Sequence, residues 1–552
     1  MTSAVFALSD RYVDAVAALD PLEATFAGIA GHDDRLPAYD PAWHEARAEL
    51  DRATLAELAT IDDESGADRL ARLVLEERLR VALELHASGA WQRDLNVIAS
   101  PLQLLVEFVD LVDVASPQGR ADLASRLEAL PGSLAGYRAS LQVGLDAGDT
   151  VAIRQVRRGI EQTRARAPHL VEVVAPLADD PDSGERLRAA ATRAADAYLA
   201  FGDWLRDGYA PHARADDAVG IDRYRVHQRA FLGADPDPAE AYAWGWTEVH
   251  RLRAEMEAVA QQILPGADLT TALHHLQHES DFAVHGVEAF RDWAQAHVDH
   301  MVDVFGRDHF DIAEPIRRCD VRVSPPGGST AAHYTGPSED GSRPGVYWQP
   351  DLQRDRYPLW GQVTTANHEA VPGHHLQIAQ VVLGGAPMSR FQRMLCWISG
   401  HGEGWALYAE RLCHEAGLLH RPEAVMGYLA SSMLRAVRVV IDIGVHCGYP
   451  LPDDAPVHPG EAWTWEAAFD LALLLTGDSP QEITSEIDRY FGWPGQAPSY
   501  KLGEREWLAA REDARSAMGD AFDAKRFHTE ALNLGSIGLD LMRTEVVRAV
   551  TR

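Results

Sequence analysis

The chain has 552 residues, of which 46% are hydrophobic and 24% are charged, the ordinary balance of a globular protein with a large core. Lys and Arg number 51 against 83 Asp and Glu, so the net charge at pH 7 is −32. A charge of this sign repels polyanions, which argues against nucleic acid and against an anionic membrane surface as partners.

The four cysteines are scattered without C-x-x-C spacing, which is typical of a reducing compartment and favours neither a disulfide framework nor a cysteine metal site. The first residues lack the basic start and long apolar run of a signal peptide. No apolar stretch is expected to approach the roughly 20 residues of a membrane span. We therefore expect a cytoplasmic protein that does not bind membranes. Its oligomeric state is not fixed by the sequence, although a helical exterior of this size would suit a homodimer.

Residues 1–320 predict helix after helix, because apolar residues recur at three- and four-residue spacing between breaks that contain Pro or Gly. The clearest examples are residues 68–79, 184–206 and 238–263. No internal repeat or low-complexity linker separates them, so a single helical unit is expected over residues 1–552. A sub-boundary near residue 240 would divide a helical cap (1–240) from the region that carries the motifs below (241–552).

Residues 320–350 change character and predict a small antiparallel β-sheet. β-Branched and aromatic residues form short runs between Pro- and Gly-containing turns, at 321–323, 332–334 and 345–348. An edge strand here would be able to pair with an extended substrate backbone. Tyr334 on such a strand and Arg343 in the following turn are therefore candidates for substrate binding, the latter through a carboxylate. The alternative is that Asp340 and Arg343 only stabilise the turn.

Residues 368–375, which read His-Glu-Ala-Val-Pro-Gly-His-His, gather three imidazoles and one carboxylate. Zinc hydrolases use imidazoles to bind the metal and a neighbouring carboxylate as the base. Their usual helical pattern is H-E-x-x-H, but the second ligand position is occupied here by Pro372. In a regular helix, His374 would lie about 120° away from His368, and His375 would lie about 10 Å along the axis. Neither would share an ion with His368 comfortably.

Pro372 removes one helical hydrogen bond, and Gly373 relaxes the backbone beside it. The pattern therefore predicts a two-residue bulge in the ligand helix, after which His374 takes the place of the second ligand. His375 is the alternative second ligand, and otherwise it would orient Glu369 or contact the substrate. A helix end with surface histidines would also produce this sequence, but such a density of histidines beside a glutamate is rare by accident.

A second informative stretch, residues 400–410, reads Gly-His-Gly-Glu-Gly-Trp-Ala-Leu-Tyr-Ala-Glu and becomes helical in its latter part. A catalytic zinc site needs three protein ligands plus water, and glutamate is a common third ligand. Glu403, which lies 29 residues after His374 (403 − 374), is the candidate. Glu410 lies two turns further along the same face and would either orient a ligand histidine or form a simple salt bridge.

Residues 424–447 predict an apolar helix that carries Arg438, Asp442 and His446 at four-residue spacing, on one face. Burying such a row is costly unless its members are paired or functional. Arg438 and His446 are therefore candidates for substrate binding, and the alternative is an internal ladder of ion pairs.

The run His-Glu-Ala-Val-Pro-Gly-His-His-Leu-Gln at 368–377 resembles the signature of the bacterial family called domain of unknown function 885 (DUF885). Residues 339–345 and 495–503 are similar to further motifs of that family, the latter with Pro498 and Ser499 inside it. The family resembles, more distantly, the carboxypeptidase Taq family and the thimet-type oligopeptidases, which carry H-E-x-G-H on a long helix. Matching the Gly-His pairs leaves this chain two residues longer, which agrees with a bulge.

The resemblance implies a mostly α, metallopeptidase-like fold with a deep central channel and a small sheet beside the zinc helix. In the carboxypeptidase Taq family the third ligand is a glutamate on the following helix, and Glu403 resembles it. Related zinc peptidases place a tyrosine over the metal, where its hydroxyl donates to the oxyanion. Tyr500 is the residue that matches, and Lys501 is the alternative donor and a candidate substrate contact.

We therefore expect a zinc metallopeptidase, carboxypeptidase- or oligopeptidase-like, that cleaves short peptides. His368, His374 and Glu403 would hold one Zn²⁺ per chain, although Mn²⁺ or Co²⁺ can occupy similar sites. Glu369 would deprotonate the water and later protonate the leaving amine. One alternative is a zinc hydrolase that acts on a non-peptide amide of a small metabolite. The other is a non-catalytic binding protein that has kept the fold.

Overall fold

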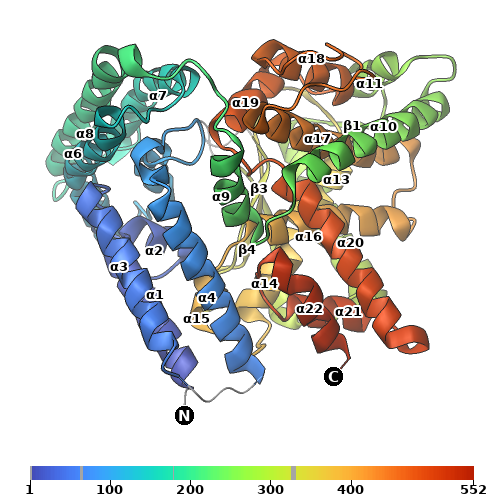
Figure 1. The fold of residues 1–552 in the computed structure, drawn as a ribbon, viewed down its shortest axis with the longest axis horizontal. Coiled ribbons are helices and arrows are strands. Elements are labelled where there is room, and N and C mark those ends of the chain that lie inside the picture. The colour runs from blue at the N-terminus through green and yellow to red at the C-terminus, as the bar shows by residue number, and fades with distance from the viewer. Residues whose placement is uncertain (1–2, 62–65, 178, 325–330, 552) are drawn as a thin grey trace. The chain divides into compact units, whose positions relative to one another are not determined.

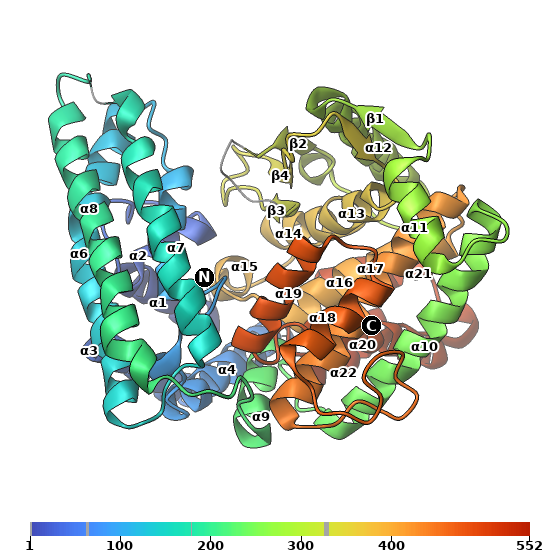
Figure 2. The same cartoon turned by 90° about the horizontal axis from the view of Figure 1, so that it is seen from above.

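The computed structural model describes residues 3–61, 66–177, 179–324 and 331–551, and confirms a mostly helical fold (Figures 1 and 2). The chain divides into two compact units. Unit 1 comprises Met1–Val226, Ser389–Leu395 and Asp488–Trp493, and unit 2 comprises His227–Met388, Cys396–Ile487 and Pro494–Arg552. The long first segment ends at residue 226, whereas the sequence suggested a sub-boundary near 240.

Unit 1 is a set of helices around one apolar core, with α6, α7 and α8 side by side (Figure 2). Four of its helices, α2, α3, α5 and α6, begin with a proline that follows an Asp or Ser at the N-cap. For example, Asp40 is the residue before α3, which starts at Pro41. Its carboxylate accepts a hydrogen bond from the backbone N–H of Trp43 at 2.7 Å. The helices of this unit are α1 (Ala4–Leu19), α2 (Pro21–Ala27), α3 (Pro41–Leu58), α4 (Gly66–Ala87), α5 (Pro101–Glu107), α6 (Pro117–Asp146), α7 (Ile153–Glu172), α8 (Gly184–Trp204) and α15 (Arg390–Met394).

Unit 2 carries the remaining helices and both sheets. Helix α10 packs along α17, where a side chain at Gly245 would collide with Val439. Helices α9 (Ile221–Leu232) and α19 (Pro480–Gly492) each cross the division between the units. The other helices are α10 (Pro238–Ile263), α11 (Leu269–His278), α12 (Val287–Asp308), α13 (Gln362–Glu369), α14 (His374–Leu383), α16 (Ser399–Glu415), α17 (Pro422–Cys447), α18 (Trp465–Leu475), α20 (Ser499–Met518), α21 (Ala524–Leu532) and α22 (Leu539–Val550).

The sheet before α13 is mixed, which corrects the expectation of an antiparallel sheet. Its strands β2 (Cys319–Val323), β4 (Gly345–Gln349) and β3 (His333–Thr335) lie in the order β2-β4-β3. Strand β3 pairs antiparallel with β4, as expected, but β4 pairs parallel with β2. The sheet is mixed because β4 lies between β2 and β3, and these two strands run in opposite directions. A separate antiparallel pair joins β1 (Ala283–His285) to β5 (Arg356–Pro358).

Helix α17 is long and apolar enough to cross a membrane by length and composition, which corrects the expectation that no stretch reaches this length. However, 78% of its most apolar window is buried inside the protein. Its apolar residues therefore pack against neighbouring helices, with α10 along its length.

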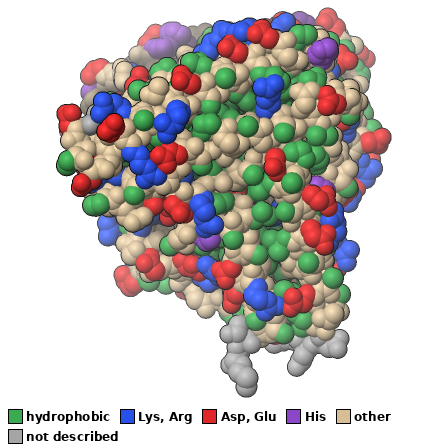
Figure 3. All heavy atoms as spheres, turned by 90° about the vertical axis from the view of Figure 1, so that its left-hand side faces the viewer, with side chains coloured by type: hydrophobic (Ala, Val, Ile, Leu, Met, Phe, Trp, Pro, Cys, Tyr) green, Lys and Arg blue, Asp and Glu red, His purple; other side chains and the backbone are tan. Residues whose placement is uncertain are grey.

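The face shown in Figure 3 carries Lys and Arg side chains interspersed with Asp and Glu side chains. On that face, the net negative charge of the chain is not gathered into a separate acidic patch.

Candidate metal centre

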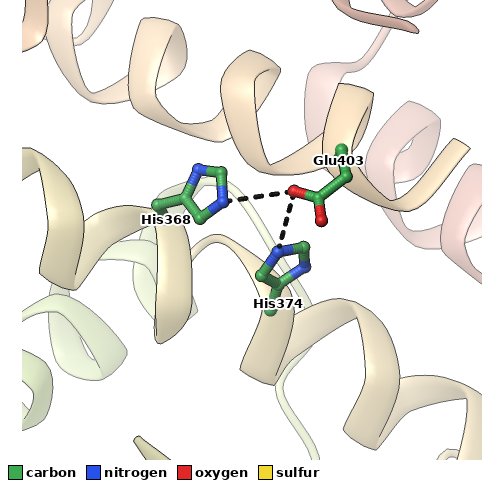
Figure 4. Close-up of side chains that lie close together, drawn as sticks. All are labelled: His368, His374 and Glu403. Carbon is green, nitrogen blue, oxygen red and sulfur yellow. Dashed lines mark ion pairs between the residues drawn. The ribbon is translucent and has the colours of Figure 1, made fainter. Parts of the chain in front are cut away.

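Three of the predicted ligands converge in unit 2. His368 lies in the last turn of α13, His374 is the first residue of α14, and Glu403 lies in the first turns of α16. Oε2 of Glu403 is 3.4 Å from Nε2 of His368 and 3.4 Å from Nε2 of His374 (Figure 4). One ligand atom from each residue can be chosen so that all three lie within 4.8 Å of one another.

The two histidines come from separate helices, which corrects the expectation of a bulge in one continuous helix. After α13 the chain makes a turn, in which the N–H of Gly373 donates to the carbonyl of Asn367 at 3.0 Å. Pro372 has no N–H with which to continue the helix. A side chain at Gly373 would collide with the carbonyl oxygens of Asn367 and His368, so only glycine fits this close return. The turn thus brings His374 beside His368, with ring centroids 4.8 Å apart.

Trp405 links this turn to α16, the helix that carries Glu403. It is fully buried and lies two residues after Glu403 on α16. Its indole N–H points at the carbonyl oxygens of Pro372 and Gly373, at 3.0 and 3.2 Å. The position of His374 relative to Glu403 is therefore set by a buried hydrogen bond that involves neither ligand side chain.

The glycines around Glu403 allow close packing on three sides. A side chain at Gly400 would contact Leu232 and Leu539 at 2.9 Å, and one at Gly402 would collide with the indole of Trp397. At Gly404 it would collide with the backbone of Gly503 on α20. The Gly-x-Gly-x-Gly spacing therefore permits α16 to approach α20 closely and fixes Glu403 in place.

Glu410 binds the ring nitrogen of His368 that does not face Glu403. Its Oε1 is 2.8 Å from Nδ1 of His368, while its Oε2 accepts hydrogen bonds from the hydroxyls of Thr364 at 2.7 Å and Ser431 at 2.8 Å. This arrangement protonates Nδ1 and turns Nε2 toward Glu403, as in the carboxylate–histidine pairs of metal sites. Glu410 was a candidate from its spacing, but Thr364 and Ser431 were missed because isolated hydroxyl residues carry no spacing signal.

The electrostatics of the cluster favour positive charge between its members. Burial lowers the pKa of His368, but hydrogen bonds with Glu403 and Glu410 and the charge of Glu369 outweigh it and raise that pKa to about 10. Burial raises the pKa of Glu403, yet the charge of His374 and the bond with His368 hold it well below its ordinary value. A cation placed here would find an ionised carboxylate beside two imidazoles.

The three residues fit a divalent metal ion. Oε2 of Glu403 is buried, and its only contacts with the two imidazoles are the long ones of 3.4 Å to their Nε2 atoms. Ligand bonds of about 2.0–2.1 Å in a tetrahedron place neighbouring donor atoms about 3.3 Å apart. The two distances of 3.4 Å from Glu403 match that spacing. Two imidazoles and one carboxylate also form a ligand set typical of catalytic zinc.

His375 forms its hydrogen bonds with residues outside the cluster of His368, His374 and Glu403. Its Nε2 lies 2.6 Å from the carbonyl oxygen of Ile316, and its Nδ1 lies 2.9 Å from the hydroxyl of Tyr334. Burial lowers its pKa to about 4, so the ring is neutral and donates from Nε2 while Tyr334 donates to Nδ1. Both nitrogens are thus engaged, and the structure groups His374, not His375, with the other ligands. The predicted substrate contacts Tyr334 and His375 instead hold each other.

Glu369, the predicted base, directly follows His368 at the end of α13 and is 8% exposed. Its charge acts on the imidazole of His368 and also on Tyr347 in β4. The carboxyl therefore lies in electrostatic range of both the first ligand and the sheet.

Arg343 is exposed in the turn between β3 and β4. The turn itself is held by Asp340, whose Oδ1 accepts hydrogen bonds from the hydroxyls of Ser338 and Ser342 at 2.6 and 2.8 Å. These bonds lower the pKa of Asp340 to about 2. The carboxylate thus stabilises the turn, while the Arg343 side chain is left at the surface.

Tyr500, at the start of α20, lies between two arginines of α17. The guanidinium of Arg438 is 4.6 Å from its ring centroid, and that of Arg435 is 5.8 Å from it. Arg438 also pairs with Glu486 at 2.7 Å. Nη1 of Arg435 donates to the hydroxyl of Ser431 at 2.9 Å, the same hydroxyl that binds the carboxylate behind the first ligand. A chain of contacts therefore links the tyrosine to the metal centre.

Lys501 and His446 are each only 1% exposed. Nζ of Lys501 is 2.5 Å from Oε2 of Glu504 and 2.7 Å from the hydroxyl of Ser432. His446 lies in the last turn of α17. The structure therefore places both in the interior of unit 2, where Lys501 is engaged with Glu504 and Ser432.

Trp397 was not singled out from the sequence, because a lone tryptophan between helices carries no spacing signal. Its ring centroid is 5.9 Å from that of His374, and it is 49% exposed.

Comparisons with known proteins place these observations in a family. A model of the family described as "Bacterial protein of unknown function (DUF885)" matches residues 21–546. No curated protein matches the chain. A crystal structure of a protein from Colwellia psychrerythraea, described as a "putative lipoprotein", has 21% sequence identity and a TM-score of 0.85, with 99% of this chain and 98% of that chain covered. A similarly described protein of unknown function from Shewanella oneidensis has 17% identity and a TM-score of 0.76, with 98% and 99% covered. At such identities the likeness shows the fold alone.

Proposed function

We propose that this chain, which belongs to the DUF885 family of bacterial proteins, is a zinc-dependent hydrolase that cleaves peptide bonds of short peptides. The observation that carries the proposal is the convergence of His368, His374 and Glu403, with a further carboxylate, Glu369, beside the first ligand. A metal site used only for structure would have no need of that extra carboxylate.

The proposed chemistry assigns one role to each side chain. An ion held by His368, His374 and Glu403 would supply Lewis-acid activation of the substrate carbonyl and of water. Glu369 would accept a proton from the attacking water and deliver it to the leaving nitrogen. Glu410 would hold the imidazole of His368 in the tautomer whose Nε2 faces the ion.

Tyr500 is proposed to donate its hydroxyl to the developing oxyanion. Support comes from its position at the start of α20, where the guanidinium groups of Arg435 and Arg438 lie over its ring. A Tyr500→Phe variant should then lower kcat while leaving zinc affinity unchanged. The related expectation of a deep channel predicts that short peptides are cleaved much faster than folded casein, and similar rates would contradict it.

The test compares the wild-type protein with Glu369→Gln, both zinc-loaded, by mass spectrometry of a pool of short peptides. The wild type should yield products whose ends identify the cut bond. The variant should be slower by about 10²–10⁴-fold, the usual contribution of a general base, with zinc content and melting temperature unchanged. Glu288→Gln, at an exposed position on α12, is the matched control and should keep full activity.

Two results would contradict the proposal. A Glu369→Gln variant that cleaves at the wild-type rate would remove the residue from the reaction. An unchanged peptide pool, with zinc bound to the wild type, would favour a non-peptide amide or a binding protein.

A cytoplasmic location is retained as a proposal on the basis of four cysteines that form no disulfide. The two similar structures described as lipoproteins argue the other way. Cell fractionation of the producing bacterium decides between them, and recovery in the membrane fraction would overturn the proposal.

A further inference from the structure

Trp397 is exposed in an unexpected place. Among the described residues it is the one tryptophan counted with the exposed large hydrophobic side chains, with 49% of its surface open. Tryptophan is highly buried on average because of its large apolar area. Its ring also lies beside the cluster of His368, His374 and Glu403, and this position makes it a candidate contact for a molecule bound there.

The segment that carries Trp397 is anchored on both sides. The thiol of Cys396 donates to the carbonyl of Ser536 at 3.3 Å, and the N–H of Ile398 donates to the hydroxyl of the same serine at 3.0 Å. These contacts hold the residues immediately before and after the indole. The exposed ring is therefore presented from a fixed position.

The indole also rests on the elements that carry the ligands. Its ring plane is tilted by 56° to the imidazole of His374, with centroids 5.9 Å apart. It packs against the backbone of Gly402, where any side chain would collide with its six-membered ring. Gly402 directly precedes Glu403. The contacts of the ring thus come from both ligand elements, and about half of its surface remains open.

We infer that Trp397 forms the floor of an apolar subsite that receives an aromatic or large aliphatic side chain next to the scissile bond. This inference rests on the proposed function. An amide carbonyl that reaches the ligands brings its flanking side chains within a few bonds of them, and so within reach of this ring. A half-exposed aromatic surface gains from the covering of its apolar area and from ring stacking.

The charges beside the ring are mixed in sign, so neither an acidic nor a basic side chain gains a clear advantage there. Glu403, which directly follows Gly402, would repel an acidic side chain. A metal ion held by His374 would repel an ammonium group, although an indole in isolation attracts one. Trp397 would therefore determine specificity through apolar contact.

The experiment uses zinc-loaded Glu369→Gln protein, which should bind peptides and turn them over only slowly. Alanine tripeptides with Phe, Ser or Lys at each position in turn are titrated by calorimetry. At one position, the Phe peptide should bind about tenfold tighter than the Ser peptide, as stacking and area burial allow. In Trp397→Ala and Trp397→Gln this ratio should fall to within about twofold, whereas Trp397→Phe should retain most of it.

Leu473→Ala is the matched control, because Leu473 on α18 is 42% exposed and should leave the ratio unchanged. Zinc content and melting temperature verify each variant. A Phe-to-Ser ratio that survives both Trp397→Ala and Trp397→Gln would overturn the inference, as would a preference for Lys or the absence of peptide binding. A Trp397-dependent preference in a protein whose wild type cleaves no peptide would instead refute the proposed function and leave the subsite standing.

Discussion

Glu410 gives the sharpest test of the metal centre, because it contacts one ligand and lies outside the set that would bind the ion. Its carboxylate is 2% exposed and accepts hydrogen bonds from three groups: the imidazole of His368 and the hydroxyls of Thr364 and Ser431. Glu410→Gln keeps the size and one acceptor oxygen but removes the charge. Glu410→Ala removes the acceptor altogether.

The expected losses follow from these contacts. A hydrogen bond to a charged group contributes about 1.5–3 kcal/mol, roughly twice that of a neutral one. Glu410→Gln should therefore weaken zinc binding by about 1–1.5 kcal/mol, or about tenfold in Kd. Glu410→Ala also leaves the buried N–H of His368 unpaired, so its loss should approach about 100-fold, the upper range for such supporting residues.

Zinc affinity is measured by competition with a chromophoric chelator at fixed pH and salt, with far-UV circular dichroism to confirm folding. Glu415→Gln, at the end of the same helix and 36% exposed, is the control and should bind zinc like the wild type. Wild-type affinity in both Glu410 variants, or weaker binding by Gln than by Ala, would refute the reasoning that this carboxylate orients a ligand.

Three further predictions concern the supports of the site. Gly373→Ala should abolish tight zinc binding while far-UV circular dichroism stays close to that of the wild type, because the added methyl collides with α13 carbonyls; retained affinity in the chelator assay would contradict it. Lys501→Met should lower the free energy of unfolding by about 1–3 kcal/mol in urea titrations, because it removes the nearer of the two cationic partners of buried Glu504 and leaves only Arg411 at 3.6 Å, and Lys501→Met/Glu504→Gln should recover part of that loss. Burial lowers the pKa of His528 to about 3 in the folded protein, so its stabilising contribution is present above the unfolded value of about 6.5 and is lost as the pH falls from there toward 3. Urea titrations at pH 7 and pH 5 should show this loss in the wild type, and a loss of equal size in His528→Gln would count against it.

The convergence of His368, His374 and Glu403 could be predicted from the sequence because their chemistry is concentrated in short runs. The failure of H-E-x-x-H at Pro372 also indicated that the helix could not be regular. The form of the irregularity could not be predicted, since a missing N–H says that one helical hydrogen bond is lost and not how the chain continues. In the structure the chain breaks into two helices, α13 and α14. The turn between them is stabilised by a hydrogen bond from the N–H of Gly373 to the carbonyl of Asn367.

The choice between His374 and His375 stayed open for a different reason. The two partners of His375 are the carbonyl of Ile316 and the hydroxyl of Tyr334, which are 59 and 41 residues away in the chain. A hydrogen bond to a backbone carbonyl has no sequence signature, and the sequence around a tyrosine on a short strand does not indicate which residue its hydroxyl will bind. Lys501 is similar, because its contact with Ser432 spans 69 residues.

The supports of the site are largely backbone contacts, and this determines how it tolerates change. Trp405 holds two turn carbonyls, Gly373 lies against the end of α13, and Gly404 lies against Gly503. A polar side chain that is lost can sometimes be replaced by a water molecule or by a rotamer change in a neighbour. No such replacement is available where two backbones are in contact, because an added Cβ would push one whole helix away from the other. Gly373 and Gly404 should therefore limit substitution more strictly than Thr364 or Ser431 do, even though neither glycine has a side chain that could donate to an ion.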